Sequence, residues 1–201
     1  MIDASQAAPQ LTVDVQAVGC DFLVFTGHKV CGPTGIGVLW GREELLNELP
    51  PFHGGGEMIE TVTMARSTYA RAPHRFEAGT PPIVEAIGLG CAVDYLGHIG
   101  LDAIHRHEQA VTAYALEGLQ SVPGVTVLNK TFFNEMTVRT SQPAVALVER
   151  LAARGILAGV PVSRLEPDDP AVANLIVLAA TELTTDADIA ALCAALAEEL
   201  Q

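Results

Sequence analysis

One stretch, Asp21–Lys29, constrains the fold more than any other part of the chain. Its residues Phe22–Phe25 are apolar and are typical of a buried strand, which runs directly into Thr-Gly-His-Lys. A second strand is predicted at Ile36–Trp40, after the turn-forming sequence Gly32–Gly35. In open α/β sheets, ligands bind beyond the carboxyl ends of the strands. We therefore expect Lys29 at a ligand-binding edge of a sheet.

A lysine at such an edge suits a covalent bond to pyridoxal phosphate (PLP), with the amine of Lys29 as the nucleophile. The hydroxyl of Thr26, the imidazole of His28 and nearby backbone N–H groups would face the phosphate. Upstream, Asp3 follows a short strand-like start, and its carboxylate would pair with the pyridine nitrogen and keep the ring cationic. Gln6 would hydrogen-bond the phenolic oxygen. The alternative for a lone lysine is a solvated loop residue.

Four motifs occur along the first part of the chain in an order that points to one family. They are Asp-Ala-Ser-Gln-Ala at 3–7, Thr-Gly-His-Lys-Val-Cys-Gly-Pro-Thr-Gly-Ile-Gly at 26–37, Gly-Gly-Gly-Glu-Met-Ile at 54–59 and Arg-Phe-Glu-Ala-Gly-Thr-Pro at 75–81. Residues 1–127 resemble the class V aminotransferase family, in its cysteine desulfurase and selenocysteine lyase branch.

The resemblance implies a set of cofactor contacts, residue by residue. The implied contacts are Lys29 at the covalent bond, Asp3 at the pyridine nitrogen, Gln6 at the phenolic oxygen, Thr26 and His28 at the phosphate, and Thr80 at the phosphate of a neighbouring subunit. The resembled enzymes are dimers, so the resemblance also implies a homodimer or a partner chain that completes the site, with a small amino acid as substrate.

Residues 128–201 resemble a different family from residues 1–127. Their segments 131–136, 153–161 and 177–182 resemble the C-terminal domain of glycine decarboxylase P-protein subunit 1, the partner that holds no PLP. The catalytic cysteine loop and the substrate-binding arginine of a desulfurase are not found there, and the first half of the large domain is missing as well. We therefore expect a truncated desulfurase-type chain that is weakly active or inactive alone. The alternatives are a non-catalytic subunit completed by a partner chain, and a fusion product that folds without activity.

The predicted fold class is α/β, in two parts. Residues 1–124 are expected to form a partial large domain of the PLP-dependent transferase type (fold type I), and residues 125–201 a small α+β C-terminal domain. The expected helices are 43–49, one that begins at 82, 101–122, 144–154 and 185–200; the expected later strands are 125–128, 132–139, 156–160 and 175–179. The helix from 82 has an apolar stripe, which is formed by Ile83, Ala86, Ile87, Gly90, Cys91, Val93 and Leu96. Residues 50–80 show no period.

Composition excludes several classes of partner. The net charge of −13, with only 11 lysines and arginines, argues against a nucleic-acid surface and an anionic membrane surface. No apolar stretch is long enough to span a bilayer, and the start lacks a signal sequence, so a cytoplasmic location is expected.

Two further groups of residues were weighed as sites. The four cysteines form no Cys-x-x-Cys pair, so reduced and mostly buried thiols are expected; they are Cys20, Cys31, Cys91 and Cys193. His105, His107 and Glu108 resemble a metal-ligand cluster, but residues two apart do not share a helix face. A solvated face is expected there, and no metal site is predicted.

Overall fold

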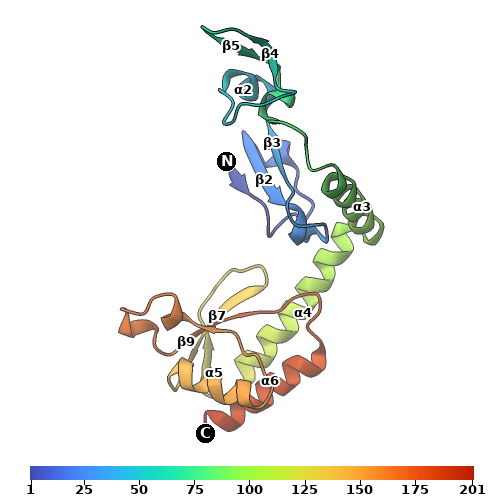
Figure 1. Ribbon diagram of the computed structural model, residues 1–201. Helices are drawn as coiled ribbons and strands as arrows, with labels where there is room; N and C mark the ends of the chain where they lie inside the picture. The colour runs from blue at the N-terminus through green and yellow to red at the C-terminus, as the bar shows by residue number, and fades with distance from the viewer. The chain divides into compact units, whose positions relative to one another are not determined.

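The computed structural model describes all 201 residues, which divide into two compact units, Met1–Ile104 and His105–Gln201 (Figure 1). The division falls inside one continuous helix, α4 (Leu101–Ser121). The predicted domain boundary at residues 124 and 125 lies just beyond the other end of α4 and stays a prediction.

The first unit is built on a small mixed sheet. Its strands are β1 (Ile2–Asp3), β2 (Phe22–Thr26) and β3 (Gly37–Gly41), in the order β1-β2-β3. Strand β1 runs parallel to β2, whereas β3 runs antiparallel to β2. The strands predicted on both sides of the lysine are therefore confirmed. A four-residue helix, α1 (Val15–Val18), lies in the crossover and is capped by the side chain of Asp14.

Helix α3 (Ile83–Ile99) is apolar on nearly every side, and only one residue of the predicted stripe, Leu96, is buried. Leu96 and Leu89 pack with Val30 in a small core, and Ala92 is buried as well. The other residues of the predicted stripe are exposed, because a helix that is apolar all round carries no signal for which face points inward.

The segment between β3 and α3 contains more regular structure than expected. After helix α2 (Glu43–Glu48), a hairpin of β4 (Ile59–Val62) and β5 (Ser67–Tyr69) forms, paired only with itself. Arg75 stabilises the base of this hairpin, where the chain enters and leaves it. Its guanidinium donates hydrogen bonds to the carbonyls of Asn47, Leu49 and Ala70, the last at 3.1 Å.

The second unit is an antiparallel sheet covered on one face by helices. The sheet order is β6 (Val125–Val127), β7 (Glu135–Thr140), β9 (Leu175–Ala179) and β8 (Val160–Pro161), and each neighbouring pair is antiparallel. Alternate residues of the two central strands, Met136 and Val138 on β7 and Ile176 and Leu178 on β9, enter the core. They meet apolar residues of α4, α5 (Ala144–Ala153) and α6 (Asp186–Glu199).

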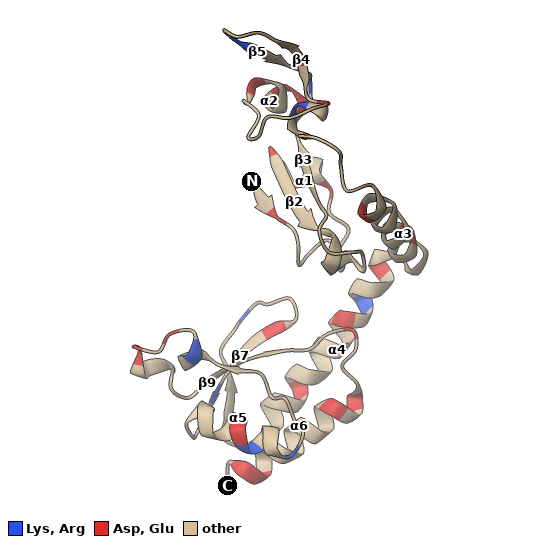
Figure 2. Ribbon diagram, in the orientation of Figure 1, with Lys and Arg blue, Asp and Glu red and all other residues tan.

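Polar contacts fix the ends of the helices in this unit. A capping box joins Thr185 and Asp188 at the start of α6. At the other end of α6, Glu199 and Glu198 pair with Arg150 and Arg154, the first on α5 and the second just after it. Figure 2 shows the acidic positions along the ribbon of α6. Such exposed ion pairs each contribute about 1 kcal/mol or less.

The strands β7 and β8 are shorter than predicted. Strand β8 covers two residues, where 156–160 was expected. Gly159 has a φ of 106°, which an extended L-residue does not adopt, so pairing begins only at Val160.

The prediction of a solvated face at His105, His107 and Glu108 is wrong for Glu108, which is only 1% exposed, and His105 is half-buried. Ile104 precedes it by four residues and Val111 follows it by three, so helix geometry places Glu108 in the inward stripe. No three His, Cys, Asp or Glu side chains are grouped so as to hold a metal ion. The cysteines are all free, but Cys31 and Cys91 are exposed and not buried as expected.

No single helix has the length and apolar composition to cross a membrane; α3 and α4 meet that test only as a pair bent by 67°.

Two glycines differ in how much a side chain at their position would destabilise the fold, because a Cβ would clash with backbone at only one of them. Gly155 and Gly159 both have positive φ, but a Cβ at Gly159 would lie 2.2 Å from the carbonyl oxygen of Val177, whereas one at Gly155 meets nothing within 4 Å. Gly155→Ala should lower the free energy of unfolding by about 1–2 kcal/mol. Gly159→Ala should cost about 3 kcal/mol or more, because the β8–β9 pair must also move. Urea denaturation of both variants checks this; equal losses would contradict it.

Candidate functional site

The pairing of the first two strands brings Asp3 and Lys29 to one edge of the sheet. Strand β1 is parallel to β2, with Asp3 opposite Val24, so the carboxyl ends of both strands lie at the same edge. Strand β2 ends at Thr26, and a single turn of 3-10 helix, Gly27–Val30, follows with Lys29 on it. This is the edge at which α/β sheets bind ligands.

Asp3 is kept anionic by its surroundings. The pKa of its carboxyl lies below the ordinary value, first because of the Ser5 hydroxyl, next because the Ser5 backbone N–H donates to Oδ1 at 2.9 Å, and least because of the charge of Lys29. A carboxylate held in the ionised form is what a partner of a protonated pyridine nitrogen requires.

Sequence reasoning missed Ser5. The sequence does contain a signal for this contact. An Asp side chain often accepts a hydrogen bond from the backbone N–H two residues later, and this arrangement is called an Asx-turn.

Thr26 and His28 are joined by a hydrogen bond. The distance from Thr26 Oγ1 to His28 Nδ1 is 2.8 Å. If the hydroxyl donates to Nδ1, the ring carries its proton on Nε2, where it is available to an external acceptor. Because His28 and Lys29 are exposed and Thr26 is half-buried, hydroxyl, imidazole and ammonium groups are offered next to one another. Such a set of donors suits a phosphate.

The turn that carries Lys29, residues 26–32 (the Lys29 turn), depends on two glycines. The N–H of Gly32 donates to the carbonyl of Gly27 at 2.9 Å, and the N–H of Gly27 donates to Ile36 at the same distance. A Cβ at Gly27 would lie 2.9 Å from the carbonyl oxygen of Pro33, and one at Gly32 would lie 2.8 Å from that of Gly27. The glycines of the motif are therefore required by close backbone packing.

The remaining predicted site residues lie on other segments of the chain. Gln6 is exposed on the segment after β1. Thr80 is exposed too and lines a hollow of about 490 Å³ together with Ile36 and Gly37, which are the partners of Gly27 and Thr26 in the Lys29 turn. The structure does not bond Thr80 to the Lys29 turn, and its role at a neighbouring subunit stays a prediction.

Comparison with known proteins identifies relatives for this arrangement. Residues 1–151 match the family model described as Aminotransferase class-V. A probable cysteine desulfurase of Streptomyces coelicolor is 63% identical over 134 residues, which are 67% of this chain and 32% of that protein. One of Synechocystis is 53% identical over 123 residues, 61% of this chain and 29% of that protein. The chain thus spans about a third of the length of these relatives.

Solved structures match over more of the chain. A cysteine desulfurase of Escherichia coli superposes with a TM-score of 0.82 and 30% identity, over 100% of this chain and 52% of that one. A cysteine desulfurase of Thermococcus onnurineus gives the same TM-score and identity over 98% and 51%. The α/β fold of these PLP-dependent fold type I enzymes therefore extends through the second unit. None of these findings supports the P-protein resemblance of residues 128–201, which stays a prediction.

The electrostatics of Asp3 lead to a test. Ser5→Ala should raise the pKa of the Asp3 carboxyl toward its ordinary value, because the largest cause of the lowering is removed. A carbon-detected NMR titration of Asp3 measures this, with Ser121→Ala, a change of a distant hydroxyl, as the control. Since the pKa is lowered in the folded protein, the contribution of Asp3 to stability is present above its unfolded pKa and is lost as the pH falls through the folded value. An unchanged titration in Ser5→Ala would contradict the assignment.

Proposed function

This chain belongs to the class-V aminotransferase family, and on that premise we propose that its Lys29 turn is the PLP-anchoring part of a cysteine desulfurase-type site. The observation that carries the proposal is the parallel pairing of β1 with β2, which sets Asp3 and Lys29 at one sheet edge. The residues at that edge fit the cofactor: a carboxylate for the ring nitrogen, an amine for the covalent bond, and hydroxyl and imidazole donors for the phosphate.

When bound, PLP supplies an electron sink for bonds to the α-carbon of an amino acid. The chain's own residues do the rest. The carboxylate of Asp3 would hold the proton at the ring nitrogen, while Thr26 and His28 would orient the phosphate. The Nζ of Lys29 would hold the cofactor covalently and would be the amine that transfers a proton. Gln6 is assigned to the phenolic oxygen.

The proposed substrate is a small amino acid of the cysteine kind, and the proposed activity of the chain alone is weak or nil. Two observations support low activity. The sequence motif for a catalytic cysteine loop is not found in residues 128–201. Asp3, His28 and Lys29 are exposed, so the site lacks the water-excluding cover that orients substrate and cofactor.

A partner that completes the site is part of the proposal. The chain spans about half of the desulfurase structures it matches, and β1 and β3 each have a strand neighbour on one side only. Ile83, Val84 and Ile87 on α3 are more than half exposed. Unpaired strand edges and contiguous apolar surface favour association, so we propose a homodimer or a complex with a separate chain.

The two lysines of the chain provide a matched test of cofactor attachment. Lys29 and Lys130 are the only lysines. After incubation with PLP and borohydride reduction, the label should lie on Lys29, and Lys29→Ala should lose both the label and the visible absorbance. Lys130→Ala should keep both. Equal labelling of the two lysines, or none with PLP in excess, would count against the proposal. If the chain alone shows desulfurase turnover that is lost in Lys29→Ala, the proposal of weak or no activity is wrong.

Assembly is tested separately. Light scattering on a gel-filtration peak at micromolar concentration should give a mass of at least twice 21.1 kDa, or co-elution with a chain that supplies the remaining large-domain strands. Ile87→Glu on the exposed face of α3 should weaken that association, because a charge is placed in an apolar interface. Glu85→Gln, a change on the same helix without added charge, is the control. A concentration-independent 21.1 kDa species would refute assembly and leave the Lys29 result unaffected.

A further inference from the structure

Helix α4 carries three polar side chains that face inward without a hydrogen-bond partner. Glu108 is 1% exposed and Thr112 is 5% exposed. Both carboxylate oxygens of Glu108, the hydroxyl of Thr112 and the Nδ1 of His105 are buried and unpaired. The spacing of three and four residues sets the three side chains on one face of the helix. We call His105, Glu108 and Thr112 the α4 polar cluster.

Two loops of the second unit lie against this part of α4. From the loop between β6 and β7, the ring of Phe133 stacks on that of His105, with centroids 5.6 Å apart and planes within 4°. From the loop between β9 and α6, the carbonyl of Glu182 accepts a bond from His107 Nε2 at 3.1 Å. Glu182 belongs to a tight turn, residues 181–184 (the 181–184 turn).

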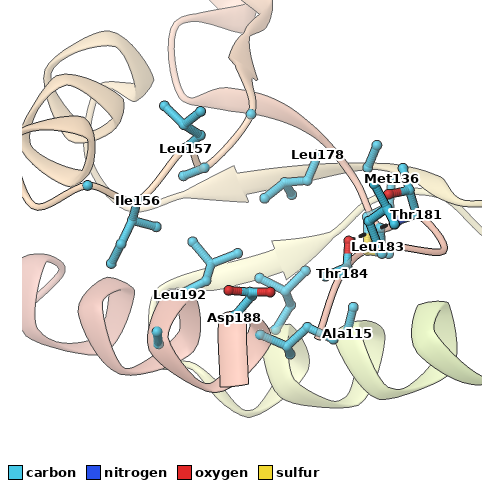
Figure 3. Close-up of a pocket in the computed structure, with 18 residues that line it drawn as sticks. Ala115, Met136, Ile156, Leu157, Leu178, Thr181, Leu183, Thr184, Asp188 and Leu192 are labelled. Atoms are coloured by element: carbon cyan, nitrogen blue, oxygen red, sulfur yellow. Dashed lines mark hydrogen bonds between the residues drawn. The ribbon is translucent and has the colours of Figure 1, made fainter. Parts of the chain in front are cut away.

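The 181–184 turn is closed by two bonds of its own. The N–H of Thr184 donates to the carbonyl of Thr181, and the N–H of Thr181 donates to the hydroxyl of Thr184, both at 3.0 Å. Thr181, Leu183 and Thr184 also line an apolar cavity of about 650 Å³ in this unit (Figure 3). The side chain of Leu183 is 81% exposed, so few apolar contacts hold the turn in place. Its one hydrogen bond to α4 is that from His107.

The charges around Glu108 do not stabilise an ionised carboxylate. Burial is the main cause of a raised pKa for this carboxyl, and the negative charge of Glu182 adds to it. His105 and His107 on the same helix act in the opposite direction, but burial outweighs them. An unpaired carboxylate in the interior either keeps its proton or recruits water.

We propose that Glu108 is a proton-operated latch for the 181–184 turn. With Glu108 neutral, the turn lies against α4 and forms part of the wall of the cavity. When Glu108 ionises, water hydrates the carboxylate. The 181–184 turn then moves away from α4, because only the hydrogen bond between His107 and Glu182 holds it there. Because the folded pKa is raised, the closed state is favoured below the unfolded pKa of a glutamate and is lost as the pH rises through the folded value.

Amide hydrogen exchange of the full chain, measured by NMR between pH 5 and pH 8 and corrected for the intrinsic rate, tests the latch. In the native chain, the amides of Thr181 and Thr184 should lose protection as the pH rises. The change should be about tenfold for each unit by which the pKa is raised. The amides of Ile176 and Leu178, on the central strand β9, should not change.

Variants distinguish the latch from other causes. Glu108→Gln, a neutral side chain of the same shape, should remove the pH dependence and keep the turn protected throughout, and Glu108→Leu should do the same if the amide disturbs folding. Glu117→Gln, on the exposed face of the same helix, should behave as the native chain does. Native pH dependence that persists in Glu108→Gln, no pH dependence in the native chain, or equal changes in β9 would each overturn the proposal.

Discussion

The register of a two-residue strand decides whether Asp3 and Lys29 lie at the same edge of the sheet. Strand β1 meets β2 through only two paired positions, extended by the N–H of Ala4, which donates to Val24 at 2.8 Å. A slip of one residue would turn Asp3 to the opposite face of the sheet, away from the Lys29 turn. The Asx-turn to Ser5 therefore has two effects: it ends the strand at a fixed residue, and it holds the carboxylate in its ionised form.

Local signals predicted the elements around this strand correctly. The apolar run of β2 and the glycine-containing turn after it are specified by residues close together in the sequence, so the sequence alone was sufficient to predict them. The hairpin β4–β5 was not predicted, because its strands have no apolar face to bury and are fixed from outside by Arg75. The inward positions of Leu89 and Ala92 on α3 were not predicted either, since they depend on what the helix packs against.

The polar face of α4 shows a different reason for error. Helical spacing indicates a buried position for Glu108, whereas the charge of its side chain indicates an exposed one. Position prevailed because Ile104, Val111 and Ala115 all lie on the same stripe, and removing their apolar surface from water outweighs the desolvation of one acid that can keep its proton. An acidic residue inside an apolar stripe of a helix thus indicates a buried carboxyl with a raised pKa.

Arg75 has a consequence for how this protein tolerates change. Its guanidinium fastens carbonyls on both sides of the hairpin, at the end of α2 and directly after β5, so the base of the hairpin is fixed independently of its tip. Met64, at that tip, is fully exposed. Because lengthening a loop whose ends are already held costs little entropy, the tip is a natural insertion point. A tag or reporter can therefore be grafted there without altering the sheet that carries Lys29.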